Sequence, residues 1–217
     1  MYFQPFPSLD GFDPSRQKLA LKTGRRELLD PGPEGWLAFL DEVGLDCTVL
    51  YPTAGLAVGL IRDSEWACIV SRAYNNWLAD RYLRAGPKFK GIALLPLQEP
   101  REAAVELRRA VSELGMVGGL LPAMGLKQPL GDERFHPIYQ EAETLNCMLA
   151  VHGAPAQGLG FALDLLFDNF PAAMTLTHPM SLMIQMTSMV FSGIFERFPN
   201  LRVGFFEAGV GWAIYML

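Results

Sequence analysis

The sequence from Cys147 to Ala154, CMLAVHGA, contains the pattern that decides the fold. Four apolar residues, Met148 to Val151, run directly into His152, and Gly153 opens a loop that contains proline and further glycines. A short apolar run bounded by turn residues is typical of a strand buried on both faces. His152 then stands at the carboxyl end of that strand, where parallel α/β proteins bind ligands and metals. The alternative is a hydrogen-bonded histidine with a purely structural role.

Composition limits the class of protein. The 217 residues are enough for one large domain or two small ones, and 50% hydrophobic against 19% charged residues indicates a globular chain. The net charge of −5 argues against a nucleic-acid partner, which requires a basic face. No basic segment followed by an apolar segment opens the sequence, so we expect no secretion signal and a cytoplasmic protein.

The three cysteines, Cys47, Cys68 and Cys147, form no CxxC pair. Cys47 and Cys147 fall in predicted strands, so buried thiols in a reducing cytosol are the simplest interpretation. A catalytic cysteine is the alternative.

Strand and helix patterns alternate along the chain after an irregular segment, residues 1–33. Apolar residues at three- and four-residue steps predict that the second helix buries Trp66, Ile69, Val70, Ala73 and Trp77, and that the third buries Ala104, Leu107, Val111 and Leu114. The predicted strands are 45–52, 89–97, 116–122, 147–152 and 201–207, and the helices between them are 34–43, 64–84, 100–114 and 135–145.

Residues 169–195 contain no Asp, Glu, Lys or Arg. That length and neutrality resemble a membrane span, but two prolines and several Thr, Ser and Gln residues make the segment too polar and too broken. We therefore expect no membrane partner. Methionines recur at every third position, 180, 183, 186 and 189, as on one face of a buried helix. Such a helix is expected in a homodimer interface or under a barrel floor.

Alternation of strands and helices predicts an α/β protein with a parallel sheet, either an open doubly wound sheet or a (β/α) barrel. Neither the GxGxxG pattern of a Rossmann fold nor a P-loop is present. His152 and Glu207 each end an apolar strand, which places them on the same rim, and His178 lies in the connection between the two strands. An imidazole and a carboxylate in that position are typical of a metal site or a general acid/base pair.

Five stretches carry a resemblance to a known family. They are LDEVGLDCTVLYPTAGL (40–56), RAYNNWLA (72–79), GIALLPLQEPREAAVELRRAV (91–111), ELGMVGGLLPA (113–123) and GIFERFPNLRVGFFEAGVGW (193–212). In these stretches the chain resembles the amidohydrolase-related family of metal-dependent TIM-barrel hydrolases, which includes the aminocarboxymuconate-semialdehyde and resorcylate decarboxylases. The resemblance covers residues 34–217, and it implies a (β/α)8 TIM barrel of which this chain supplies about the second to the sixth strand.

The resemblance also implies site residues. The family holds its metal with a His-x-His or Glu-x-His pair on the first strand, a histidine ending the fifth strand and an aspartate ending the eighth. This implies His152 as a metal ligand, with zinc as the expected ion and manganese or iron as alternatives. The acid/base histidine that ends the sixth strand of the decarboxylases is replaced by Glu207, so Glu207 and His178 are the candidate catalytic residues.

Two features depart from the family pattern. No His-x-His lies near the amino end, since the first histidine is His136, and no seventh or eighth strand precedes Leu217. The resemblance therefore predicts a chain that is incomplete at both ends.

Three functions follow from these observations. The favoured one is a metal-dependent hydrolase that cleaves C–N or C–O bonds of a small organic substrate with metal-bound water. The first alternative is a non-oxidative decarboxylase on the same scaffold, which the histidine-to-Glu207 exchange weakens. The second is a non-catalytic barrel fragment or binding scaffold, because most of the family's metal ligands are absent.

Overall fold

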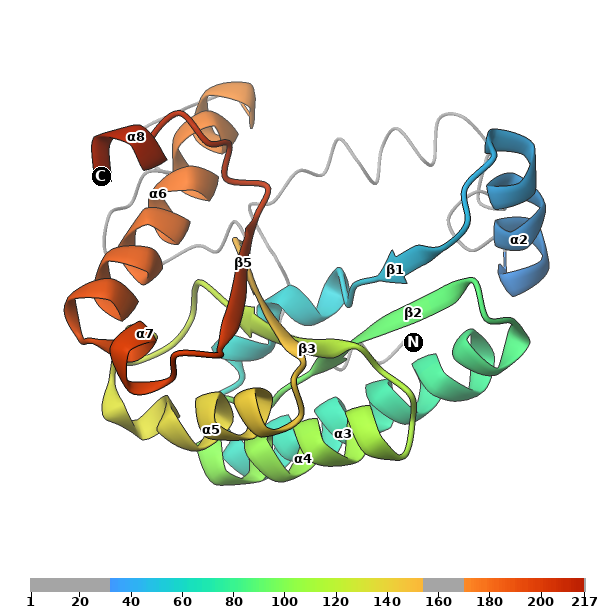
Figure 1. The fold of residues 1–217 in the computed structure, drawn as a ribbon, viewed down its shortest axis with the longest axis horizontal. Coiled ribbons are helices and arrows are strands. Elements are labelled where there is room, and N and C mark those ends of the chain that lie inside the picture. The colour runs from blue at the N-terminus through green and yellow to red at the C-terminus, as the bar shows by residue number, and fades with distance from the viewer. Residues whose placement is uncertain (1–31, 154–169, 217) are drawn as a thin grey trace.

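The structure is a computed structural model that describes residues 32–153 and 170–216 (Figure 1). Within these residues, helices alternate with parallel strands. The strands are β1 (Thr48–Leu50), β2 (Phe89–Leu94), β3 (Gly118–Pro122), β4 (Met148–His152) and β5 (Arg202–Phe206). The helices are α2 (Gly32–Val43), η2 (Ala54–Leu60), α3 (Ser64–Arg81), η3 (Leu83–Ala85), α4 (Pro100–Ser112), η4 (Glu133–Phe135), α5 (His136–Thr144), α6 (Phe170–Phe191), α7 (Ile194–Arg197) and α8 (Ala213–Met216), where η marks a 3-10 helix.

The strands form one curled sheet. They pair in chain order, β1-β2-β3-β4-β5, and every pair is parallel. Helices α3, α4 and α5 lie side by side along the convex face (Figure 1). On the concave side the ring of Tyr51, just beyond β1, meets the ring of Phe206 in β5, with centroids 5.3 Å apart. The first and last strands thus approach each other across half a barrel, which confirms the predicted α/β class and partial (β/α)8 barrel.

Strand residues alternate between two apolar clusters, as the pleat of a strand requires. Because both faces are covered, the strands appear in the sequence as unbroken apolar runs. The concave cluster consists of Val58, Ile61, Ala67, Ile92, Leu94, Leu120 and Ala150. The convex cluster includes Ala93, Leu95, Leu107, Leu121, Leu149 and Val151.

The buried faces of α3 and α4 differ from the predicted ones. In α3, Ile69 and Trp77 are 52% and 48% exposed. In α4, only Leu107 of the predicted residues is buried. Both predictions selected apolar residues by their spacing, but these helices also bury small and polar side chains against their neighbours. The buried residues of α3 are Ala67, Val70, Ser71, Asn75, Leu78 and Ala79, and those of α4 are Ala103, Glu106, Leu107 and Ala110.

Asn75 is buried because it continues the sheet. β1 ends at Leu50, opposite Gly91 in β2, so β1 does not reach Leu94. The Asn75 side chain instead donates from Nδ2 to the Leu94 carbonyl (3.0 Å) and accepts at Oδ1 from the Leu94 amide (2.8 Å). Nδ2 also donates to Oε1 of Glu106 (2.8 Å), so one side chain joins α3, α4 and β2.

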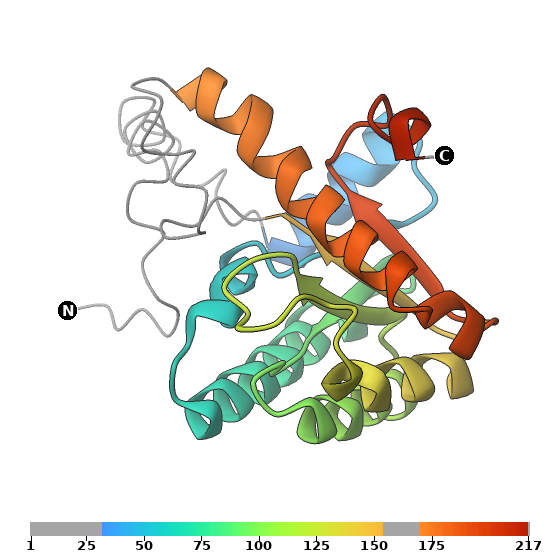
Figure 2. The ribbon, with the colours of Figure 1, turned by 90° about the vertical axis from the view of Figure 1, so that its left-hand side faces the viewer.

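The charge-free segment forms α6, which crosses the carboxyl side of the sheet (Figure 2). Gln185 accepts from the Leu130 amide (2.7 Å) and donates to the carbonyl of Ala123, just beyond β3 (2.8 Å). The predicted position under the barrel floor is therefore wrong. The segment lacks charged residues because amide and hydroxyl side chains satisfy its polar contacts. None of the helices in the described part of the chain has the length and apolar character needed to cross a bilayer.

Two predictions near the amino end need correction. The strand predicted over 45–52 is too long, because residues 45–47 are exposed and only Thr48–Leu50 pair with β2. Cys47 is consequently exposed, and of the two cysteines predicted in strands only Cys147 is buried. Most of the segment predicted to be irregular, 1–33, lies outside the described residues, but Gly32 and Pro33 already belong to α2.

Candidate metal centre

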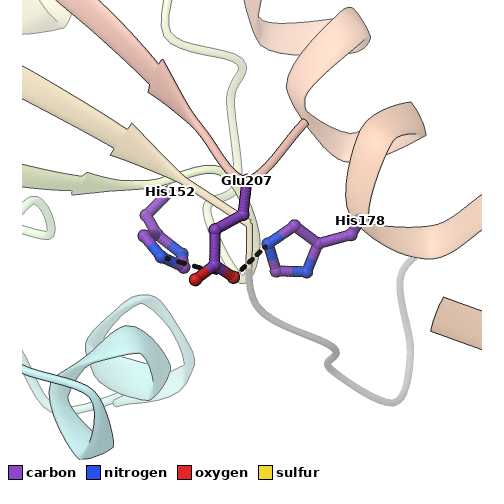
Figure 3. Close-up of side chains that lie close together, drawn as sticks. All are labelled: His152, His178 and Glu207. Atoms are coloured by element: carbon purple, nitrogen blue, oxygen red, sulfur yellow. Dashed lines mark ion pairs between the residues drawn. The ribbon is translucent and has the colours of Figure 1, made fainter. Parts of the chain in front are cut away.

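Three side chains from three elements meet at the carboxyl end of the sheet (Figure 3). His152 is the last residue of β4, Glu207 directly follows β5, and His178 lies in α6. One possible ligand atom of each lies within 4.8 Å of those of the other two. The structure thus brings together the three residues that the sequence singled out.

His152 presents one ring nitrogen to the other two residues. Its Nδ1 lies 2.6 Å from the carbonyl oxygen of Gly153, and a ring nitrogen beside a carbonyl oxygen carries the proton. In this tautomer of the neutral ring, Nε2 keeps its lone pair, and it lies 3.9 Å from Oε2 of Glu207. A histidine whose second nitrogen is fixed by a carbonyl is typical of metal ligands.

His178 is buried against Gly153. A Cβ at Gly153 would lie 2.9 Å from Cδ2 and 3.0 Å from Nε2 of His178, so only glycine permits this approach. Neither ring nitrogen of His178 has a hydrogen-bond partner among the described residues. Burial, reinforced by His152 and opposed by Glu207, lowers the pKa of His178. The imidazole is therefore neutral near pH 7, which is the form that binds metals.

Glu207 adopts a backbone conformation that is unusual for a residue other than glycine. Its φ is +60°, a left-handed conformation that costs about 1–3 kcal/mol and occurs preferentially at functional sites. The carboxylate lies between the two imidazole rings (Figure 3), with Oε2 3.5 Å from Nε2 of His178. The side chain is 68% exposed, so it faces the open mouth of the half barrel.

These residues fit a divalent metal ion. Two ligands with bonds near 2.1 Å to a tetrahedral metal lie roughly 3.4 Å apart, close to the 3.5 and 3.9 Å that separate Oε2 of Glu207 from Nε2 of His178 and Nε2 of His152. Imidazole nitrogen and carboxylate oxygen suit zinc, manganese and iron alike. Among the described residues the buried nitrogens of His178 have no hydrogen-bond partner, which indicates a group that the side chains alone do not supply.

Other candidate residues lie elsewhere. His136, the first residue of α5, packs its ring against Phe198 with centroids 5.5 Å apart and is not part of the cluster. No cysteine joins the only cluster of potential metal ligands in the described residues. Sequence analysis missed the contact between Gly153 and His178. The position of Gly153, directly after the histidine that ends β4, was the available signal for a close approach.

A parallel half barrel with two histidines and a carboxylate at its carboxyl end defines a (β/α) barrel protein with a candidate metal centre. The family model of amidohydrolases matches residues 28–217, and the chain belongs to this amidohydrolase family.

Curated relatives of the chain are decarboxylases. The chain is 30% identical over 186 residues to gamma-resorcylate decarboxylase of Rhodococcus jostii (strain RHA1), covering 81% of this chain and 55% of that protein. It is 27% identical over 180 residues to 2-amino-3-carboxymuconate-6-semialdehyde decarboxylase of Dictyostelium discoideum, covering 82% and 48%. The chain thus spans about half the length of the curated relatives that it matches. These names favour the decarboxylase alternative over the hydrolase that the sequence analysis preferred.

Solved structures agree on the fold. The chain superimposes on 5-carboxyvanillate decarboxylase from Sphingomonas paucimobilis with a TM-score of 0.66 and 26% identity, covering 78% of this chain and 49% of that one. Dihydroxybenzoic acid decarboxylase from Polaromonas sp. JS666, solved with bound manganese and the inhibitor 2-nitroresorcinol, gives a TM-score of 0.75 at 23% identity, covering 99% and 65%.

Proposed function

We propose that the chain belongs to a metal-dependent, non-oxidative decarboxylase acting on a small aromatic or unsaturated carboxylate. The convergence of His152, His178 and Glu207 at the carboxyl end of a barrel sheet is the observation that carries this proposal. The decarboxylase names of the relatives support the reaction type.

In this proposal His152 and His178 hold the metal through their neutral imidazoles. Manganese is the favoured ion, because two related decarboxylases were solved with it, and zinc is the alternative. When bound, the ion would hold and polarise the substrate's carboxylate and a neighbouring oxygen.

Glu207 is proposed as the proton carrier. In its protonated form it delivers a proton to the substrate carbon that bears the carboxylate, and a new C–H bond forms. The C–C bond to the carboxylate then breaks, its electron pair returns to the substrate ring, and carbon dioxide leaves. Glu207 is left as a carboxylate, and solvent at the open mouth returns its proton.

Two wider expectations complete the proposal. The protein would act in the cytoplasm, and it would form a homodimer through the charge-free helix α6, which exposes Val190 and Phe191 (46% and 85%). Light scattering coupled to size-exclusion chromatography would test the dimer, and a monomeric mass at all concentrations would contradict it.

The first experiment measures manganese binding by electron paramagnetic resonance. We expect the unmodified chain to bind about one ion, and His152→Ala and His178→Ala to abolish binding. His136→Ala is the matched control, because it removes the remaining histidine and leaves the cluster intact. Absence of binding in every form would contradict the proposal and support a non-catalytic scaffold.

The second experiment measures carbon dioxide release from 2,6-dihydroxybenzoate. Glu207→Gln should retain the metal and lose at least about 100-fold in rate, the usual contribution of a positioned acid. If this variant loses the metal, the result would instead indicate that Glu207 is a metal ligand. Release of carbon dioxide at an unchanged rate would refute its role in proton transfer.

A further inference from the structure

An aromatic pair lies beside the candidate metal centre. Tyr51 follows β1 and Phe206 ends β5, yet their rings meet with centroids 5.3 Å apart and planes inclined by 50°. Phe206 is paired in register with His152 and directly precedes Glu207. Through Phe206, the aromatic pair therefore lies next to His152 and Glu207.

The environment of Tyr51 is apolar. Its side chain packs against the concave cluster together with Phe206, and it is half-buried. Tyrosine combines an apolar ring with a polar hydroxyl, and at binding surfaces this hydroxyl usually finds a hydrogen-bond partner. Among the described residues, none provides a hydrogen bond to the Tyr51 hydroxyl, so this donor is available to a molecule in the mouth of the half barrel.

We propose that Tyr51 is a specificity-determining residue: its ring and that of Phe206 support the substrate ring, and its hydroxyl donates a hydrogen bond to an oxygen substituent on that ring. This inference rests on the proposed function and deepens it. The pair supplies apolar surface, and His152, His178 and Glu207 supply polar groups beside it at the carboxyl end of the sheet. Such a site binds a ring with an oxygen substituent more tightly than a ring with an apolar one, because the apolar substituent would leave the Tyr51 hydroxyl without a hydrogen-bond partner.

The test compares two probes of nearly equal size, 2-hydroxybenzoate and 2-methylbenzoate. Their dissociation constants are measured by saturation-transfer NMR with manganese-saturated protein. Tyr51→Phe should weaken binding of the hydroxy probe about tenfold, as expected for one lost hydrogen bond, and leave the methyl probe unchanged. Phe206→Leu should weaken both probes alike. Tyr215→Phe, which removes a hydroxyl from an 84% exposed residue, is the control and should change neither.

The outcomes separate this inference from the proposed function. If the unmodified chain releases carbon dioxide but Tyr51→Phe binds both probes as before, the specificity role of Tyr51 is wrong and the decarboxylase proposal stands. If Tyr51→Phe weakens the binding of both probes equally, the proposed hydrogen bond from Tyr51 to the ring substituent is likewise wrong. If the unmodified chain binds neither probe and releases no carbon dioxide, both proposals fail.

Discussion

Replacement of Asn75 by leucine tests the most consequential polar contact in the fold. The substitution removes three hydrogen bonds, two to the backbone of Leu94 and one to Glu106. Glu106 keeps Arg109 as a partner, with Nη2 to Oε1 at 2.6 Å, whereas the amide and carbonyl of Leu94 lose their partner inside a fully buried cluster. Each buried group left without a partner costs about 1–3 kcal/mol, so we expect Asn75→Leu to lower the free energy of unfolding by about 3–5 kcal/mol.

That loss is a large part of the roughly 5–15 kcal/mol by which domains of this size are stable. Urea titration followed by tryptophan fluorescence and far-ultraviolet circular dichroism would measure it, with the slope of the transition as a check on cooperativity. The matched control is Asn76→Ala, because Asn76 is exposed and its side chain only accepts from Nη1 of Arg109 (2.9 Å). The control should change stability by less than about 0.5 kcal/mol. If Asn75→Leu lowers the free energy of unfolding by less than about 1 kcal/mol, the view that the Asn75 side chain takes the place of a neighbouring strand beside Leu94 is refuted.

Three further predictions concern other parts of the molecule. At pH 8 a thiol reagent should modify the exposed Cys47 at once. Burial raises the pKa of Cys147 to about 11, so about one Cys147 side chain in a thousand is a thiolate at this pH. Cys147 should therefore react only when the protein unfolds. Gln185→Leu should lower the urea midpoint by an amount equivalent to about 2–4 kcal/mol, because two backbone groups in the loop after β3 lose their partner; an unchanged midpoint would contradict this. Gly153→Ala should weaken manganese binding at least about tenfold in a titration, because the Cβ of the new alanine displaces the imidazole of His178. A shift of only a few tenths of an ångström is enough to misplace a metal ligand. Unaltered affinity in this variant would show that His178 is not a ligand.

The sheet could be predicted from the sequence because its strands are buried on both faces. Runs such as Met148 to Val151 contain no polar residue, and the turn residues after them mark the edge where function concentrates. His152 and Glu207 could be found for the same reason, since each follows such a run directly.

The helix faces could not be predicted in the same way. Periodicity considers only apolar side chains, so it selected Trp77, which is half exposed, and passed over Asn75, which is fully buried. Asn75 is buried because β1 ends early, and this depends on the geometry of a neighbouring strand that no local pattern contains. The close packing of His178 on Gly153 also joins distant segments, so spacing indicated only that His178 could reach the mouth.

The spacing of the strands along the chain has a consequence for the order of folding. α4 joins β2 to β3, and η4 with α5 joins β3 to β4, whereas residues 153–201 separate β4 from β5. Contacts between residues distant in sequence form late, because the intervening chain must first be ordered. β5 is therefore expected to join a preformed β2–β4 unit, and His178 and Glu207 reach His152 only in that final step. Metal affinity appearing during refolding would then report completion of the half barrel rather than formation of its first strands.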